Sequence, residues 1–459
     1  MPDTIAAIST PFGEGAIALI RLSGPHAGRI AGHVFRGKKP VAELTPRVQH
    51  YGEIFHGDQK IDDVLLTVFR APHSYTGEEV VEIAGHGGVL VSRRILEALL
   101  QNGARSAEPG EYTQRAYLNG KMDLTQAEAV MDLISAQTDL ALQAATEQLE
   151  GRLGQRIREL REGVIEVLAH VEAYIDFPDE DIDPATGEKL LQKIDARIAD
   201  IEQLLSTAQR GKVLREGLRT VIFGAPNVGK SSLLNLLLGH ERAIVSARPG
   251  TTRDVIEETI DLRGFPLRLI DTAGVRESDD EIERAGIERT QQQLERADLI
   301  LHVLDGTQPR PANGNWAAAG MFEEQRYETG PAILVLNKSD LPEDPSWQAP
   351  DSGKLKPVRI SCLAGTGMDE LAEAIVSRVS VGQATHRDWS LAINARHADC
   401  LQRARLQAIA ARQAFLDGLS PEFIAEELRG TLDAVGEIVG KADSEDILGK
   451  IFSTFCIGK

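Results

Sequence analysis

Apolar residues recur every three or four positions in three stretches of the chain, which predicts amphipathic helices that each bury one face. The stretches span residues 157–175, 191–205 and 424–439, and the alanine-rich segment 398–416 is also typical of a helix. An acidic loop at 178–184 separates the first two stretches. The apolar positions on these faces are Ile157, Leu160, Val164, Leu168, Val171, Ile175, Leu191, Ile194, Ile198, Ile201, Leu205, Ile424, Leu428, Leu432, Val435 and Val439.

The first part of the chain has a different pattern, in which short β-branched and apolar runs alternate with helix-like segments. One helix should open at Gly24-Pro25, and a second should run from Val89 to Leu100 and end near Gly103. This alternation predicts an α+β domain. The expected strands are residues 16–21, 64–69 and 80–83.

The centre of the chain contains four more apolar runs, at 218–223, 267–270, 332–336 and 358–360, which indicate buried strands of a doubly wound α/β sheet. Helical patterns occur on both sides of this block, so we expect one discontinuous helical bundle into which the block is inserted. The expected boundaries are 1–120 for the N-terminal domain, 121–215 and 380–459 for the two parts of the helical domain, and 216–379 for the inserted domain.

The start of the first helical region carries a possible capping signal. Thr125 and Glu128 have the spacing of a capping box, in which a hydroxyl and a carboxylate satisfy backbone N–H groups at a helix N-terminus. We therefore expect the helix to begin at Thr125.

Bulk properties limit the possible functions. A length of 459 residues suits about three domains. The net charge of −19 argues against broad electrostatic binding of nucleic acid, so any RNA role needs a local basic patch or a partner. Three scattered cysteines suit neither a disulfide framework nor a zinc cluster, and the chain shows no basic-apolar leader or membrane-length apolar run. We expect a cytoplasmic protein.

The strand expected at 218–223 leads directly into Gly224-Ala-Pro-Asn-Val-Gly-Lys-Ser231, which has the phosphate-binding loop pattern, and then into a helix. The glycines allow backbone N–H groups to approach phosphate oxygens, and the helix N-terminus adds a favourable dipole. Lys230 should reach the β- and γ-phosphates, and Ser231 should ligate Mg²⁺. This loop alone does not separate ATP from GTP.

Guanine selectivity is indicated by Asn337-Lys-Ser-Asp340, which follows another expected strand. The carboxylate of Asp340 can accept from two guanine N–H groups, whereas adenine presents the wrong polarity there. Asn337 should brace the loop, and the stem of Lys338 should cover the base. Asp271-Thr-Ala-Gly274 should hold Mg²⁺ through water and meet the γ-phosphate, Gly250-Thr-Thr-Arg-Asp254 should supply a switch threonine, and Ser361-Cys-Leu-Ala-Gly365 should back the base.

Hydrolysis needs an oriented water and neutralised charge more than covalent help. Val275 occupies the position where Ras-type enzymes carry a glutamine, so Glu283 is our candidate for positioning the water; the residues by themselves slightly favour a solvated carboxylate at a helix start. An arginine finger is not evident, although Arg253 and Arg276 are available. The side-chain oxygen of Asn227 could instead help to hold a monovalent cation beside the phosphates.

Several segments outside the nucleotide motifs resemble the MnmE (TrmE) family of bacterial tRNA-modification GTPases, and the resemblance covers essentially the whole chain. It implies a dimerising N-terminal folate-binding domain, a discontinuous helical domain and an inserted Ras-like P-loop GTPase domain. The segments are Ser74-Tyr-Thr-Gly-Glu-Glu79, Gly85-His-Gly-Gly88, Pro109-Gly-Glu-Tyr112, Asn119-Gly-Lys-Met-Asp-Leu124, Asp176-Phe-Pro-Asp-Glu180 and Phe455-Cys-Ile-Gly-Lys459.

The resemblance also implies an activity. With the flavoprotein MnmG, also called GidA, such proteins add a carboxymethylaminomethyl or aminomethyl group to the 5-carbon of the wobble uridine of certain tRNAs, and the one-carbon unit comes from a tetrahydrofolate derivative. It further implies K⁺-stimulated GTP hydrolysis that is activated when two GTPase domains meet, within a homodimer.

Site residues follow from the matching positions. Ser231 and Thr252 match the Mg²⁺ ligands, Glu283 matches the water-orienting glutamate, and Cys456 matches a candidate nucleophile or ligand. Asn227, Ser246, Arg248 and Thr251 match the K⁺ site, and Arg21, Glu82, Lys121 and Lys459 match contacts to 5-formyl-tetrahydrofolate. The full set expected around GTP is Asn227, Val228, Gly229, Lys230, Ser231, Ser232, Ser246, Thr251, Thr252, Asp271, Thr272, Ala273, Gly274, Asn337, Lys338, Asp340, Ser361 and Cys362.

Two positions depart from the family pattern, and two other functions stay open. Ser246 replaces a frequent threonine but can still offer its carbonyl to K⁺, and Cys362 replaces the usual alanine behind the base, where the contribution is a backbone N–H. The alternatives are a regulatory GTPase switch in ribosome or RNA assembly, and a folate-binding module with a vestigial GTPase domain. The intact nucleotide motifs argue against the second of these.

Overall fold

The computed structural model describes residues 3–176, 184–240, 243–244, 257–271, 292–310, 330–348, 356–379, 392–441 and 445–459. The chain forms two compact units. The first unit comprises Met1–Met131, Leu149–Ile198 and Arg403–Lys459, and the second comprises Asp132–Gln148 and Ala199–Gln402. Each unit therefore combines segments that are far apart in the sequence.

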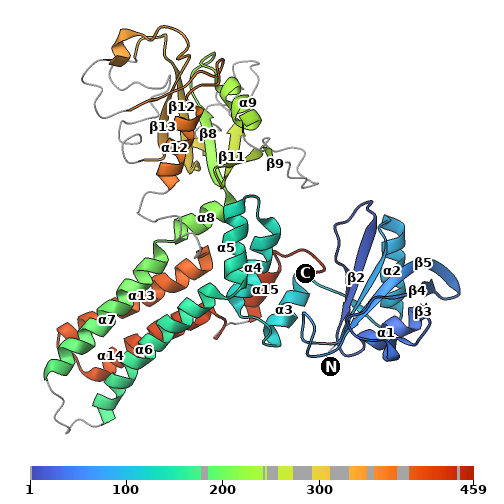
Figure 1. Ribbon diagram of the computed structural model, residues 1–459. Helices are drawn as coiled ribbons and strands as arrows, with labels where there is room; N and C mark the ends of the chain where they lie inside the picture. The colour runs from blue at the N-terminus through green and yellow to red at the C-terminus, as the bar shows by residue number, and fades with distance from the viewer. Residues whose placement is uncertain are drawn as a thin grey trace. The chain divides into compact units, whose positions relative to one another are not determined.

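A seven-stranded sheet organises the N-terminal part of the first unit (Figure 1), with strand order β3-β4-β5-β6-β2-β1-β7. All pairs are antiparallel except β1 with β7. Helices α1 (Ala27–Val34) and α2 (Val89–Gln101) pack on one face, as the predicted α+β domain requires. The strands are β1 (Ile5–Ile8), β2 (Ile17–Ser23), β3 (Phe35–Gly37), β4 (His50–His56), β5 (Gln59–Phe69), β6 (Val80–His86) and β7 (Arg105–Ser106).

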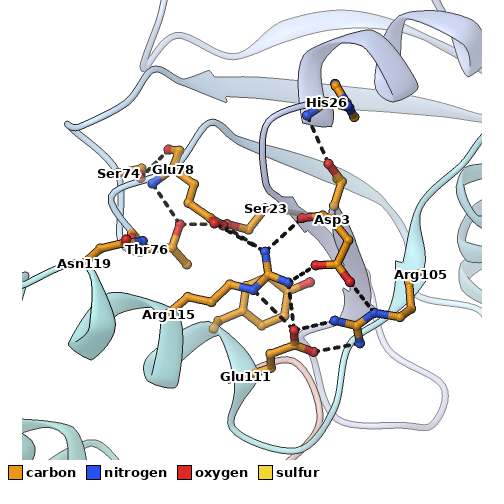
Figure 2. A network of polar contacts seen from close by, with 12 residues as sticks. Asp3, Ser23, His26, Ser74, Thr76, Glu78, Arg105, Glu111, Arg115 and Asn119 are labelled. Atoms are coloured by element: carbon orange, nitrogen blue, oxygen red, sulfur yellow. Dashed lines mark hydrogen bonds and ion pairs between the residues drawn. The ribbon is translucent and has the colours of Figure 1, made fainter. Parts of the chain in front are cut away.

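Charged side chains join the start of the chain to helix α3 (Glu111–Leu118). Arg115 lies between Asp3, Glu78 and Glu111 (Figure 2), and its guanidinium is 2.6 Å from Asp3 and 2.8 Å from Glu111. Arg105 also forms ion pairs with Asp3 and Glu111. Its hydrogen bond to Asp3 lowers the pKa of that carboxyl to about 2. The network thus secures the N-terminus and the segment around Glu78, which the resemblance had singled out.

The helical part of the first unit is a discontinuous bundle, as predicted. Helix α6 (Arg152–Asp176) packs against α14 (Pro421–Ile438), together with parts of α7 (Pro184–Leu205) and α13 (Ala395–Leu416). Ion pairs join the two sequence regions, for example Arg412 with Asp195 at 2.5 Å. Buried residues of the predicted apolar faces include Ile157, Leu160, Val164, Leu168, Val171, Ile194, Ile424, Leu428 and Val435.

The predicted capping box at Thr125 is wrong, because the capping residue is Asp123, two positions earlier, and the helix begins at Leu124. In α4 (Leu124–Ser135), the Gln126 N–H donates to Asp123 Oδ1 at 3.0 Å, and the Asp123 N–H donates to Gln126 Oε1 at 3.0 Å. Asp123 and Gln126 therefore form the reciprocal cap. Thr125 lies in the first turn and donates its hydroxyl to Asp123 at 2.6 Å. The pairs Thr125–Glu128 and Asp123–Gln126 have the same spacing, so only the observed start of the helix shows which pair forms the cap.

The C-terminal segment packs against the same unit. Phe452, at the end of α15 (Glu445–Phe452), and Phe455 share a small core with Leu124 of α4. Beyond them, the tail reaches the N-terminal domain, where Ser9 Oγ donates to the Gly458 carbonyl at 3.2 Å. The C-terminal tail therefore contacts the segment between β1 and β2.

The second unit is built on a seven-stranded, mainly parallel sheet with the order β14-β13-β12-β8-β11-β10-β9, and it confirms the predicted α/β fold (Figure 1). Only β10 pairs antiparallel, with β9 and β11. Apolar cores lie on both faces, which explains why β12 is apolar at successive positions. The strands are β8 (Leu218–Phe223), β9 (Ala243–Ile244), β10 (Glu257–Leu262), β11 (Phe265–Asp271), β12 (Leu299–Asp305), β13 (Ala332–Asn337) and β14 (Val358–Arg359).

Helical segments from outside this sheet complete its core. Ala141 and Ala144 of α5 (Asp139–Leu149) and Leu214 of α8 (Ala208–Glu216) join the core on one face, beside α9 (Lys230–His240) and α12 (Met368–Val379). Within the described residues, the helices are all too short or too polar to cross a bilayer.

Candidate guanine-nucleotide site

The phosphate-binding loop connects β8 to α9 at the carboxyl edge of the sheet, where ligands of doubly wound folds bind. Gly224 and Gly229 have φ values of +154° and +102°. A Cβ atom would lie 2.3 Å from the Val303 carbonyl at Gly224, and 2.2 Å from Asn337 Nδ2 at Gly229. Both positions therefore require glycine, because neighbouring polar atoms leave no room for a side chain.

The other loop residues present polar groups toward solvent. Lys230 Nζ donates to the carbonyls of Gly224 and Ala225 at 2.9 and 2.8 Å, so the lysine side chain folds back onto the start of the loop. Ser231 and Ser232 are exposed in the first turn of α9. Asn227 is exposed with φ of +64°, a left-handed conformation that asparagine tolerates well. This arrangement suits an anion near the helix N-terminus and a cation beside it.

Asn337 connects three segments of the site. Its side chain is 3% exposed, and its Nδ2 donates to the Val228 carbonyl of the phosphate-binding loop at 2.8 Å. Its Oδ1 accepts the Cys362 N–H at 3.0 Å. One buried amide thus joins the phosphate loop, the base-reading loop and the segment that backs the base, which agrees with the bracing role expected for Asn337.

Asp340 is oriented by Ser361, whose buried hydroxyl donates to Asp340 Oδ1 at 2.5 Å and accepts the Ala364 N–H at 3.0 Å. An oriented carboxylate suits the two adjacent N–H groups of guanine. Burial raises the pKa of the Cys362 thiol to about 11, so this side chain stays neutral at physiological pH. Its replacement of alanine therefore introduces no charge behind the base.

Sequence reasoning missed Asp305, the last residue of β12. Lys338 Nζ lies 2.6 Å from Asp305 Oδ2. A signal was available, because a carboxylate directly after a buried parallel strand lies at the ligand-binding edge of the sheet.

Several expected site residues lie outside the described part of the chain. Asp271 is described only through its backbone, which ends β11 and pairs with Ile222 of β8. The strand thus ends beside the phosphate loop, as the expected Mg²⁺ role requires. The expected site residues outside the described ranges are Ser246, Arg248, Thr251, Thr252, Thr272, Ala273, Gly274 and Glu283.

The first unit places three of the four expected folate contacts around Tyr112. Arg21 pairs with Glu82 at 2.8 Å, and its guanidinium lies 5.7 Å from the centre of the Tyr112 ring. The Tyr112 N–H donates to the main-chain oxygen of Lys459 at 3.2 Å. These residues come from β2, β6, α3 and the C-terminal tail, so the tertiary structure assembles them.

The fourth residue, Lys121, lies on a neighbouring loop. Its Nζ donates to the Pro72 carbonyl at 3.1 Å, in the segment that carries Tyr75. The Tyr75 ring lies 5.9 Å from the Arg21 guanidinium. Sequence reasoning did not predict an aromatic partner for Arg21. Cys456 is exposed in the tail that also carries Lys459. The backbone of this tail also contacts Gly110 and Tyr112 at the start of α3.

The parallel sheet, its phosphate-binding loop and the Asn337–Asp340 loop define a P-loop protein that binds guanine nucleotides. Residues 4–121 match the family description "GTP-binding protein TrmE N-terminus", and residues 124–456 match "MnmE helical domain". The chain belongs to the MnmE (TrmE) family of tRNA modification GTPases.

Curated relatives resemble the chain along its full length. The tRNA modification GTPase MnmE of Akkermansia muciniphila is 50% identical, and the match covers 99% of each chain. Those of Geobacillus kaustophilus and Aquifex aeolicus are 46% and 45% identical over 100% of this chain and 99% and 100% of their own. Among solved structures, the G domain of the T. maritima FeoB iron transporter matches 35% of this chain and 98% of its own at 25% identity, with a TM-score of only 0.25.

If Asp340 reads the base, its replacement should change the preferred base from guanine to xanthine. Asp340→Asn replaces an acceptor by a donor that suits the C2 carbonyl of xanthine, so GTP binding should weaken at least about 100-fold and xanthosine triphosphate should bind more tightly than GTP. Titration calorimetry with both nucleotides measures this. Asp344→Asn is the control, because Asp344 accepts from Ser346 on the same loop. Unchanged preference in Asp340→Asn would contradict the assigned role.

Proposed function

We propose that this chain is a cytoplasmic GTP hydrolase that acts in modification of the wobble uridine of tRNA. In this proposal, it works with the flavoprotein MnmG to add a carboxymethylaminomethyl or aminomethyl group at the 5-carbon. The observation that carries the proposal is full-length similarity to proteins named tRNA modification GTPase MnmE. The hydrogen bonds of Asn337 to Val228 and of Ser361 to Asp340 support it.

The nucleotide chemistry is assigned to residues of this chain. Lys230 and the N–H groups of the loop would hold the phosphates, and Ser231 and Thr252 would ligate Mg²⁺, which neutralises charge that develops on the phosphate oxygens. Asp271 would hold the ion through water. Glu283 would orient the attacking water. The exposed Ser231 at the start of α9 and the end of β11 beside the loop support this assignment.

A monovalent cation is proposed in place of an arginine finger. Asn227, Ser246, Arg248 and Thr251 would hold K⁺ beside the phosphates, and hydrolysis would accelerate when the GTPase domains of two copies meet. The exposed Asn227, held at φ of +64° within the phosphate-binding loop, supports this position for the ion. Its side-chain oxygen is a suitable ligand for a hard cation.

The one-carbon donor would bind to the N-terminal domain. We assign 5-formyl-tetrahydrofolate to Arg21, Glu82, Lys121 and Lys459, with Cys456 nearby as a candidate nucleophile or ligand in the modification step. The Arg21–Glu82 pair is partly buried against aromatic rings, where a polar pterin-type ring can both stack and form hydrogen bonds.

Homodimerisation would use the face of the N-terminal sheet that α1 and α2 leave open. Ile17 and Tyr51 are each 67% exposed on this face, and Leu65 pairs with Tyr51 across β4 and β5. Strand register brings Ala84 of β6 and its neighbours onto the same face. Exposed apolar side chains on a sheet face are typical of protein contacts.

Cells that lack this chain should lose the C5-modified wobble uridine, as read by mass analysis of tRNA nucleosides. The wild-type chain should restore it, and Lys230→Ala should not, because that variant loses its phosphate contact. Lys356→Ala removes an exposed lysine of the same unit and serves as the control. Unchanged modification in the deleted cells would instead favour a switch in ribosome or RNA assembly.

GTP turnover should rise severalfold when Na⁺ is replaced by K⁺, because the proposed cation site is expected to bind K⁺ in preference to Na⁺. Asn227→Gly retains the left-handed backbone and removes the side-chain oxygen, so it should bind GTP but lose the difference between the two salts. Phosphate release measured in matched salts gives the rates. Equal wild-type rates in K⁺ and Na⁺ would exclude the cation mechanism.

Calorimetry should show binding of 5-formyl-tetrahydrofolate to the full chain, and Arg21→Ala should weaken it about tenfold or more through the loss of a charged contact. Arg36→Ala is a matched control, because Arg36 also lies over an aromatic ring, that of Phe55, at 3.7 Å. An absence of heat with the wild-type chain would remove the folate assignment while leaving the GTPase assignment intact.

A further inference from the structure

We propose that Asp305 is a positioning residue for guanine, which acts by holding the Lys338 side chain in the conformation that covers the base. The inference rests on the GTPase function proposed above. It assigns a role to a side chain outside the phosphate loop and the Asn337–Asp340 loop.

The two oxygens of Asp305 have separate partners. Lys338 Nζ lies 2.6 Å from Oδ2. The other oxygen, Oδ1, accepts the Thr307 N–H at 3.0 Å and the Thr307 hydroxyl at 2.7 Å. Thr307 therefore fixes the orientation of the carboxylate, and Lys338 is held by an acceptor that is itself held.

Backbone contacts place the carboxylate beside the base-reading loop. Asp305 pairs in register with Asn337, since β12 and β13 are neighbouring parallel strands. The Gly306 N–H donates to the Asn337 carbonyl at 2.9 Å, and the Asp344 N–H donates to the Gly306 carbonyl at 2.9 Å. The loop after β12 is thus hydrogen-bonded to both ends of the loop that contains Lys338.

The environment keeps the Asp305 carboxylate ionised. The Asp305 side chain is 13% exposed and that of Lys338 is 35% exposed. Burial disfavours the ionised carboxyl, but hydrogen bonds from Lys338 and Thr307 outweigh it and hold the pKa of Asp305 below its usual range. Asp305 is therefore ionised at physiological pH, and the contact is a charge-assisted hydrogen bond.

The flexibility of the lysine side chain means that its ion pair with Asp305 can affect nucleotide affinity. A lysine side chain has four rotatable bonds, and fixing it on binding costs free energy through lost rotamer freedom. Lys338 also has φ of +69°, so the backbone turns at this residue and directs its side chain to β12. With Nζ held by Asp305, much of the ordering cost is met before the nucleotide arrives. The effect should appear in nucleotide affinity rather than in the rate of the chemical step.

The test compares Asp305→Asn in two backgrounds of the full-length chain. In the wild-type background, this isosteric change should weaken GDP binding by about tenfold, and it should raise the KM for GTP by a similar factor with kcat unchanged. In a Lys338→Met background, which retains most of the stem but has no ammonium group, the same change should cause little further loss. Asp305→Glu keeps the charge and should recover part of the affinity.

Glu343→Gln provides the matched control, because it breaks a 2.8 Å ion pair with Arg359 next to the same loop. It should leave GDP affinity unchanged. Wild-type affinity in Asp305→Asn, or an equal loss in both backgrounds, would overturn the inference, since the second result means that Asp305 does not act through Lys338. Failure of the wild-type chain to bind GDP would instead contradict the proposed GTPase function.

Discussion

The nucleotide site depends on one buried amide, that of Asn337. Its nitrogen donates to Val228 and its oxygen accepts from Cys362, so a single planar group sets the spacing of three loops. Replacing it by an apolar side chain would leave a buried carbonyl and a buried N–H without partners, at a cost of about 1–3 kcal/mol each. Gly229 is tied to the same constraint, because a side chain there would collide with the Asn337 amide.

The strand order of the second unit brings these loops together. Parallel strands β8, β12, β13 and β14 all end at one edge, so the segments after them converge there although they are far apart in the sequence. The first unit achieves a comparable convergence differently. Its C-terminal tail contacts Ser9 of the N-terminal domain and Tyr112 beside Arg21. A site in that region therefore combines the C-terminal tail with the N-terminal domain.

Much of the fold was predictable, because it follows from local patterns. Periodic apolar faces identified the long helices, and apolar runs before Gly224 and Asn337 identified the strands of the central sheet. The helix cap was predicted at Thr125 but is Asp123, since two overlapping pairs of residues had the spacing of a capping box. Asp305 and the aromatic partners of Arg21 were missed, because those contacts join segments that are far apart in the sequence.

The amino-acid sequence by itself determined which loops can bind phosphate and guanine. Each of those functions belongs to one contiguous segment, and the glycines and polar residues of that segment determine its local backbone conformation. The tertiary structure decided which distant side chains support them, including Asp305 for Lys338 and Ser361 for Asp340. Such pairs form only after strand order and register place the loops side by side, and neither order nor register is encoded within any single segment.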